Sequence, residues 1–272
     1  MSLSKAQLSK LLEANPECVD CGTRDPDWAS ISLGVMMCIE CSGIHRSMGV
    51  HVSKVRSLTL DRWTAPLMEL LQVAGNQNAN KVWEACSSNP GFSKLTPGAD
   101  RGTRESFIRA KYEQRKFLDP SYDPSPEAVL CSSRRLFDAC KNGGMLDAQW
   151  CLAHGADVNW ANPEAAGHTA AHTASMGSRV AMLELLANNG CNLGAKGNDE
   201  KTPLDLAGRD GGASEADLVA VKHLLSKPSS SQASGGVGVG GGGATGTSWA
   251  AAAAAPPTAA AGNVAQYLQQ QR

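Results

Sequence analysis

Four cysteines are spaced so that they could hold a metal ion. Cys18 and Cys21 form one pair, Cys38 and Cys41 form a second, and sixteen residues separate the pairs. A gap of two residues lets both sulfurs of a pair face one point, and four thiolates at this spacing favour zinc over an iron–sulfur cluster or four unrelated buried cysteines. Because four sulfurs leave no position for water, we predict one Zn²⁺ with a structural role.

Arg46 lies five residues beyond Cys41, on backbone that the predicted metal would fix. From spacing alone it fits a surface ion pair and a catalytic arginine equally well. His45 and His51 flank it, and we interpret both as structural, because four sulfurs already complete the zinc shell. The other cysteines show no pairing pattern and are expected to be small buried hydrophobes: Cys86, Cys131, Cys140, Cys151 and Cys191.

The sequence around these residues resembles the catalytic core of the Arf GTPase-activating proteins. Their signature is Cys-x2-Cys-x16-Cys-x2-Cys-x4-Arg, which the four paired cysteines and Arg46 meet without a gap. The resemblance is close over residues 28–61 and continues through the segments 75–76, 80, 83–84 and 107–112. It therefore covers essentially the whole N-terminal part of the chain.

The resemblance implies that Arg46 is a finger that enters the nucleotide site of a GTP-bound Arf-family GTPase. GTP hydrolysis concentrates negative charge on the phosphoryl oxygens, and a guanidinium there accelerates the reaction by roughly 10³ to 10⁵. The resemblance also marks Trp28 and Asp61 as second-rank site residues, with Asp61 orienting Arg46. A core tryptophan and a capping aspartate are the alternative interpretations of these two.

No phosphate-binding loop of the form Gly-x4-Gly-Lys-Ser/Thr occurs in the sequence. The nucleotide is therefore expected to belong to the partner, and the chain to be an activator in trans that is not itself a GTPase. Its expected partners are a GTP-bound Arf-family GTPase, an unknown protein ligand and, transiently, a membrane surface.

The first domain is expected at residues 3–119. Ser4 and Gln7 form a capping box for a helix that ends at Asn15, and Leu8, Leu11 and Leu12 supply its apolar face. Residues 55–60 have the pattern of a strand. Thr64 is expected to cap a helix that ends at Gly75.

The last helix of this domain is expected from Thr103 to about Lys116. Its apolar side carries Phe107, Ile108 and Tyr112. Its basic residues are interpreted as a solvated face, with a membrane-binding patch as the alternative: Arg109, Lys111, Arg115 and Lys116.

A repeat of 33 residues follows a linker at 120–127. The segment Thr169-Ala-Ala-His-Thr-Ala returns as Thr202-Pro-Leu-Asp-Leu-Ala, which resembles the Thr-Pro-Leu-His-x-Ala pattern of ankyrin repeats. We expect about three repeats within residues 128–227, with helices near 134–154, 169–189 and 202–225. Terminal repeats of such stacks are often atypical, and the first and last units here depart most from the pattern.

We therefore expect an α+β zinc-finger domain of the Arf GTPase-activating type, with a small central sheet flanked by helices, followed by an all-α ankyrin stack. Residues 228–272 are rich in Gly, Ser and Ala and are expected to be disordered, apart from a weak helix around Val264, Tyr267 and Leu268. The ankyrin repeats are expected to bind protein partners.

Composition favours a cytoplasmic protein. Nine cysteines and an N-terminus without an apolar export segment indicate a reducing compartment, and Pro256 and Pro257 interrupt the alanine-rich stretch near the C-terminus. By analogy with Arf activators, the chain is expected to act in vesicle trafficking and to be recruited peripherally to Golgi, endosomal or plasma membranes.

Two other functions remain open at this stage. Four-cysteine fingers also bind nucleic acid, but the formal net charge of −1, and the 15 Lys/Arg against 13 Asp/Glu in residues 1–120, lack the basic excess that such binding needs. We expect no nucleic-acid partner. A catalytically silent ankyrin scaffold is the other alternative, and the presence of Arg46 argues against it.

Overall fold

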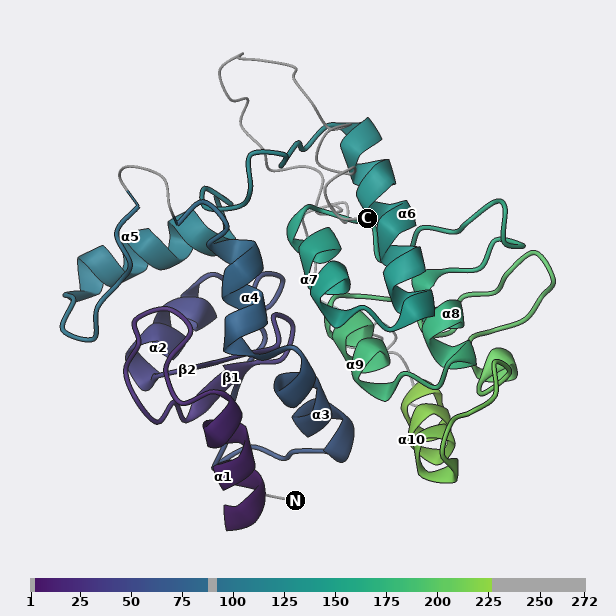
Figure 1. The fold of residues 1–272 in the computed structure, drawn as a ribbon, viewed down its shortest axis with the longest axis horizontal. Coiled ribbons are helices and arrows are strands. Elements are labelled where there is room, and N and C mark those ends of the chain that lie inside the picture. The colour runs from purple at the N-terminus through teal and green to yellow at the C-terminus, as the bar shows by residue number, and fades with distance from the viewer. Residues whose placement is uncertain (1–2, 88–91, 227–272) are drawn as a thin grey trace, which may run out of the picture.

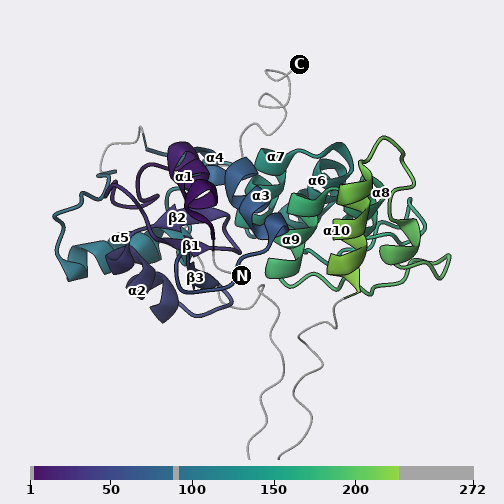
Figure 2. The ribbon, with the colours of Figure 1, turned by 90° about the horizontal axis from the view of Figure 1, so that it is seen from below.

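The computed structural model describes residues 3–87 and 92–226, which form two blocks that lie side by side (Figure 1). A view turned by 90° shows the same arrangement (Figure 2). The N-terminal block combines helices with a small sheet, and the second block is helical. This confirms the predicted order of an α+β domain and a helical stack; the tail predicted at 228–272 lies outside the described residues.

The N-terminal block is built around a three-stranded antiparallel sheet in the order β2-β1-β3. Trp28 of the central strand pairs with Met37 of β2 and with Ser57 of β3. The elements of this block are α1 (Lys5–Ala14), β1 (Trp28–Ser30), β2 (Val35–Met37), α2 (Ile39–Ser47), β3 (Val55–Ser57), α3 (Ala65–Val73), α4 (Gly75–Trp83) and α5 (Arg101–Tyr112).

The first helix begins and ends as its sequence predicts. Ser4 accepts a hydrogen bond from the Gln7 amide, the Gln7 side chain accepts one from the Ser4 amide, and Asn15 caps the C-terminus. Leu11 is fully buried, in a cluster that includes Ala29 and Met36 of the sheet. The capping box therefore places the apolar face of α1 against the sheet.

Three predicted boundaries in this block were wrong: the end of the strand at 55–60, the start of the last helix, and the end of that helix, which stops at Tyr112 and not near Lys116. Side-chain hydrogen bonds explain the first two. The strand expected at 55–60 stops at Ser57, because the Asp61 carboxylate accepts from the Ser57 amide and the Ser57 hydroxyl accepts from the Leu60 amide. These bonds turn the chain. The helix expected to begin at Thr103 begins at Arg101, because the Asp100 carboxylate caps it.

The second block stacks three helical units. Its elements are α6 (Pro126–Asn142) with α7 (Met145–Ala153), α8 (Ala170–Met176) with α9 (Val180–Asn188), and the 3-10 turn η1 (Leu204–Leu206) with α10 (Glu215–Leu225). The first unit begins earlier than expected, because Ser125 caps α6 and Pro126 occupies its first turn. In the second unit, His172 Nδ1 accepts from the Thr169 amide, which fixes the start of α8.

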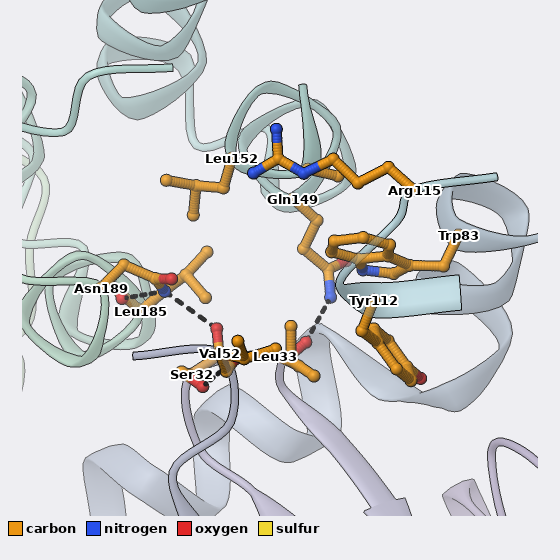
Figure 3. Close-up of a pocket in the computed structure, with 11 residues that line it drawn as sticks. Ser32, Leu33, Val52, Trp83, Tyr112, Arg115, Gln149, Leu152, Leu185 and Asn189 are labelled. Carbon is orange, nitrogen blue, oxygen red and sulfur yellow. Dashed lines mark hydrogen bonds between the residues drawn. The ribbon is translucent and has the colours of Figure 1, made fainter. Parts of the chain in front are cut away.

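The two blocks share an interface formed by α3 and α4 on one side and α7 and α9 on the other (Figures 1 and 2). Leu70 and Ala74 of the first block belong to the apolar core of the second. The turn between β1 and β2 is held from the second block: Asn189 Nδ2 donates to the Ser32 carbonyl at 2.8 Å, and Gln149 Nε2 donates to the Leu33 carbonyl at 3.2 Å (Figure 3).

Across residues 3–87 and 92–226, every helix lacks the combination of length and apolar character needed to cross a bilayer.

Candidate functional site

The four paired cysteines meet at one point in the N-terminal block. All four are buried, and their sulfurs lie within 4.8 Å of one another, with the Cys21 and Cys38 sulfurs 3.6 Å apart. Four ligands about 2.3 Å from a tetrahedral zinc ion are about 3.8 Å from each other. The donor set and its spacing therefore fit one Zn²⁺, and confirm the predicted structural zinc site.

Arg104 lies against this thiolate cluster, which the sequence did not indicate. It is buried, and its Nη1 donates to the Cys41 sulfur at 3.2 Å while Nη2 donates to the Pro97 and Ala99 carbonyls. Four thiolates and Zn²⁺ carry a net negative charge, so a guanidinium beside them is electrostatically favourable. We interpret Arg104 as a partner of the zinc ligands.

Arg46 lies in the last turn of α2, the helix that starts directly after the ligand Cys38 and carries the ligand Cys41. Its side chain is exposed. The guanidinium carbon lies 4.3 Å from the centre of the Trp28 ring, a cation–π distance. Within the described part of the chain, the guanidinium makes no hydrogen bond and no ion pair, so its N–H groups remain available to an incoming anion.

Trp28 forms the support for this arginine. It is only 9% exposed and is fixed as the first residue of the central strand, with β2 and β3 on either side. Its Nε1 is buried and has no hydrogen-bond partner among the described residues. Trp28 is therefore a core residue by burial, and it also lies beneath the predicted finger.

Asp61 is placed by a different contact. Its carboxylate accepts from the Ser57 amide at 2.7 Å, and no hydrogen bond or ion pair joins it to Arg46 in the described segments. Since Ser57 pairs with Trp28, this bond fixes the strand that supports the ring. An action of Asp61 on Arg46 stays a prediction.

A buried cluster of charged side chains includes His45 of α2. His45 Nε2 lies 3.0 Å from Asp20 Oδ2, and Lys111 Nζ lies 3.1 Å from Asp20 Oδ1 and 2.7 Å from Glu84 Oε1. Asp20, His45 and Lys111 are fully buried. Burial alone would raise the pKa of Asp20, but the Lys111 ammonium and the hydrogen bond to His45 outweigh it, and the pKa lies below its ordinary value.

The predicted solvated face on the last helix was wrong for Lys111. Burial alone would lower the pKa of this ammonium, but the Asp20 and Glu84 carboxylates reverse the effect and raise the pKa. Arg109 binds Glu105 and Glu113 on its own helix, and Arg115 donates to the Tyr122 hydroxyl. Since Lys111 faces inward and Arg109 is paired, these residues do not form the alternative basic patch either.

The interpretation of the unpaired cysteines as buried hydrophobes holds for two of them. Cys140 and Cys151 are buried in the core of the second block, whereas Cys86 and Cys191 are only half-buried. Cys131 is exposed on α6, so the expectation was wrong there.

Exposed apolar side chains flank Arg46, and sequence reasoning missed them. Ile39 lies seven residues before the arginine, on the same side of α2, and Val50 lies four residues after it, beyond the end of the helix at Ser47. Leu60 lies on the turn after β3. Their exposed fractions are 58%, 73% and 81%. The helical period could have indicated Ile39, because an apolar residue in register with an exposed arginine is expected to be exposed as well.

A small cavity of about 30 Å³ lies between the two blocks (Figure 3). Trp83 and Arg115 of the first block and Leu152 of the second line it, and Gln149 Oε1 is buried there without a partner among the described residues. This volume suits one ordered water molecule and is far below that of a small-molecule site.

Comparison with protein families agrees with this geometry. The family described as "Putative GTPase activating protein for Arf" matches residues 5–121, and the family of ankyrin repeats in three copies matches residues 136–233. The first match contains the four cysteines and Arg46.

The names of two curated relatives combine an Arf-GAP with ankyrin repeats. The rat protein "Arf-GAP with coiled-coil, ANK repeat and PH domain-containing protein 2" is 34% identical over 272 residues, covering 74% of this chain and 35% of its own length. Human "ARF GTPase-activating protein GIT2" is 34% identical over 216 residues, covering 76% and 28%. The human "Arf-GAP with coiled-coil, ANK repeat and PH domain-containing protein 3" is 50% identical over 115 residues, covering 42% and 14%. The chain thus spans about a third or less of the length of these relatives.

Proposed function

Because residues 5–121 of this chain form an ArfGAP domain and are followed by ankyrin repeats, we propose that the protein accelerates GTP hydrolysis by an Arf-family GTPase, with Arg46 as the finger. The observation that carries the proposal is the state of that side chain. It is exposed, unpaired within the described residues, and held over Trp28 on a helix that a zinc ligand begins.

Arg46 would act on charge that the partner develops. As the terminal phosphate departs, negative charge grows on its oxygens, and the planar guanidinium donates to two of them at once. The zinc cluster and the Trp28 ring limit the motion of the arginine before the GTPase binds, so little conformational entropy is lost on binding. Trp28 and Asp61 would support the finger from below, Trp28 by contact and Asp61 through β3.

The apolar residues around the finger would contact the GTPase. Ile39, Val50 and Leu60 are exposed large hydrophobic side chains, and Ile39 and Val50 lie within seven residues of a cation that must be desolvated to reach a phosphate. Their burial against a partner would exclude water from the site and strengthen the charge interaction. The proposed partner is therefore a GTP-bound GTPase with an apolar surface beside its nucleotide.

A turnover assay tests the finger directly. Purified GTP-loaded Arf is mixed with the wild-type chain, Arg46→Ala or Arg46→Lys, and phosphate release is measured. We expect Arg46→Ala to lose roughly 10³ to 10⁵ in rate, equal to about 4 to 7 kcal/mol of transition-state stabilisation. Arg46→Lys should keep the fold and lose most of the activity, because its point charge lacks the planar fork.

The matched control is Lys116→Ala, which removes an exposed cation from the same domain. Its activity should equal that of the wild type, and zinc content and circular dichroism should be the same in all variants. Equal turnover by wild type and Arg46→Ala would refute the finger and favour a silent scaffold. Steeply salt-dependent DNA binding would instead support a nucleic-acid function.

The ankyrin repeats are proposed to bind a protein partner. Their second helices α7 and α9 already contact the first domain, so the face of the first helices and the loops between units remains for the partner. Recruitment to Golgi, endosomal or plasma membranes would follow from binding a membrane-associated GTPase.

A further inference from the structure

His45 is the residue directly before Arg46, and its side chain is buried whereas that of Arg46 is exposed. Its ring is fully buried, with Nε2 3.0 Å from Asp20 Oδ2 and Nδ1 2.8 Å from the Ser53 hydroxyl. The Ser53 hydroxyl in turn donates to Ser30 Oγ at 2.8 Å, on the central strand. Both ring nitrogens are therefore engaged, one on the zinc side and one on the sheet side.

Asp20 connects this ring to the metal site. It lies between the ligands Cys18 and Cys21 in the sequence, so its backbone moves with the zinc cluster. Its second carboxylate oxygen accepts from Lys111 Nζ and from the Tyr112 hydroxyl, both at 3.1 Å. Asp20 therefore cannot turn away from His45 without breaking contacts with α5.

We propose that His45 is a positioning residue that fixes the rotation of α2 about its axis and thereby aims Arg46; this rests on the proposed function of Arg46. Successive residues of a helix point about 100° apart. If His45 is held inward by Asp20 and Ser53, the direction of Arg46 is determined, and it is the direction that places the guanidinium over Trp28.

The energetic cost of burying the charged side chains around His45 supports a positioning role for this residue over a role in packing alone. Burying a carboxylate, an ammonium and an imidazole together stabilises a fold no better than well-packed apolar residues of similar size would. A fully bonded polar network does, however, admit only one geometry, whereas apolar contacts allow a helix to rotate or slide. Two other residues also restrain this nine-residue helix, Cys41 through the metal site and Ile44 through the apolar core, and His45 adds directional bonds one residue from Arg46.

Two amide substitutions of His45 distinguish the role of its Nε2 atom from that of its Nδ1 atom. The amide nitrogen of Gln reaches the place of His Nε2, so His45→Gln keeps a donor toward Asp20. The amide of Asn reaches only the place of Nδ1, so His45→Asn loses the contact with Asp20. We expect His45→Asn to lower kcat for phosphate release by about 10- to 100-fold, as a displacement of about 1 Å does, with KM for the GTPase little changed. His45→Gln should retain most of kcat.

Two controls distinguish positioning from loss of stability. Ile44→Val trims a buried neighbour on the same helix without touching the network, so it lowers the unfolding temperature but should leave kcat unchanged. In the Arg46→Ala background, His45→Asn should lower kcat no further, because the residue acts through the arginine. If His45→Asn still lowers kcat there, or if Ile44→Val lowers it equally, the proposal is wrong.

The assay is run with zinc-loaded full-length protein, well below the unfolding temperature of every variant. Should His45→Asn fail to fold, Ser53→Ala loosens the other side of the ring, and a kcat equal to that of the wild type would then overturn the proposal. A wild type no faster than Arg46→Ala would instead refute the finger itself. Hydrogen exchange of the α2 amides, faster in His45→Asn than in His45→Gln, gives a readout that does not depend on activity.

Discussion

The two blocks of this chain bury different kinds of side chain. Among the described residues of the first block, Asp20, Glu84, Arg104 and Lys111 are buried together with four metal-binding thiols, whereas Glu184 is the one Asp, Glu, Lys or Arg buried in the second. The second block instead packs alanines and leucines of adjacent helices. The first block therefore relies more on charged and metal-binding contacts, and the second more on repeated apolar surfaces.

The largest expected difference comes from the metal. Cys41→Ala should unfold the first block, because structural zinc contributes an apparent ~10 to 16 kcal/mol and net domain stability is ~5 to 15 kcal/mol. Zinc content and tryptophan fluorescence would show the loss. Cys140→Ala, which removes a buried thiol from the second block, is the control and should leave zinc bound. If Cys41→Ala still folds and activates Arf, the first block does not depend on the metal, and the contrast drawn between the two blocks is wrong.

Lys111→Met tests the buried charges. It removes the ammonium and leaves Asp20 and Glu84 short of a partner, and breaking a buried ion pair in this way costs about 3 to 5 kcal/mol. Urea unfolding followed by circular dichroism measures the change. The exposed Lys116→Met should alter the free energy of unfolding by no more than about 0.5 kcal/mol. Equal stability of the two variants would show that the charged cluster is dispensable.

Leu183→Ala tests the apolar stack. Leu183 is fully buried in the core that joins α9 to its neighbours, so truncation should cost about 2 to 5 kcal/mol through lost burial and a cavity. The same urea titration measures it, and zinc content should not change. Val219→Ala, at a side chain that is 61% exposed, is the matched control. Zinc loss in Leu183→Ala would show that the two blocks do not differ as described.

Arg104→Gln should have the smallest effect. Loss of the hydrogen bond to the Cys41 sulfur is expected to weaken zinc binding by about 10- to 100-fold, as removal of outer-sphere partners does elsewhere. Competition with a colorimetric chelator measures this affinity. Arg101→Gln removes an exposed arginine at the start of the same helix and should retain wild-type affinity. Identical zinc release from both variants would rule out a role of Arg104 toward the metal.

The sequence predicts the features of the fold and the site that are encoded by recognisable local motifs. The zinc ligands follow from two Cys-x2-Cys pairs, the capping box from Ser4 and Gln7, and the ankyrin register at Thr169 from a 33-residue repeat, and the structure confirms all three. Lys111 and Arg104 did not follow, because their partners lie far away in the chain. Lys111 meets Asp20 across 91 residues, and a lysine on a helix is ordinarily solvated.

The end of β3 was also predicted wrongly, although the residues that determine it lie close together in the sequence. Residues 55–60 have the composition of a strand, but the choice between extending and turning is made by the side chains of Ser57 and Asp61. Those side chains bond to backbone amides that a longer strand would have used for pairing. The exposed residue Leu60 was also missed, because exposure of an apolar residue outside a helix follows from packing and not from its type.

The apolar contact of Leu70 and Ala74 with the second block sets a limit on how this chain can be divided. A protein cut between α5 and α6 would leave these side chains, and the α3 and α9 surfaces that enclose them, facing water on both fragments. Each fragment would then expose an apolar surface and tend to self-associate. The connection between the two blocks is therefore not a thermodynamic boundary, and the N-terminal block is best regarded as half of a larger folded body.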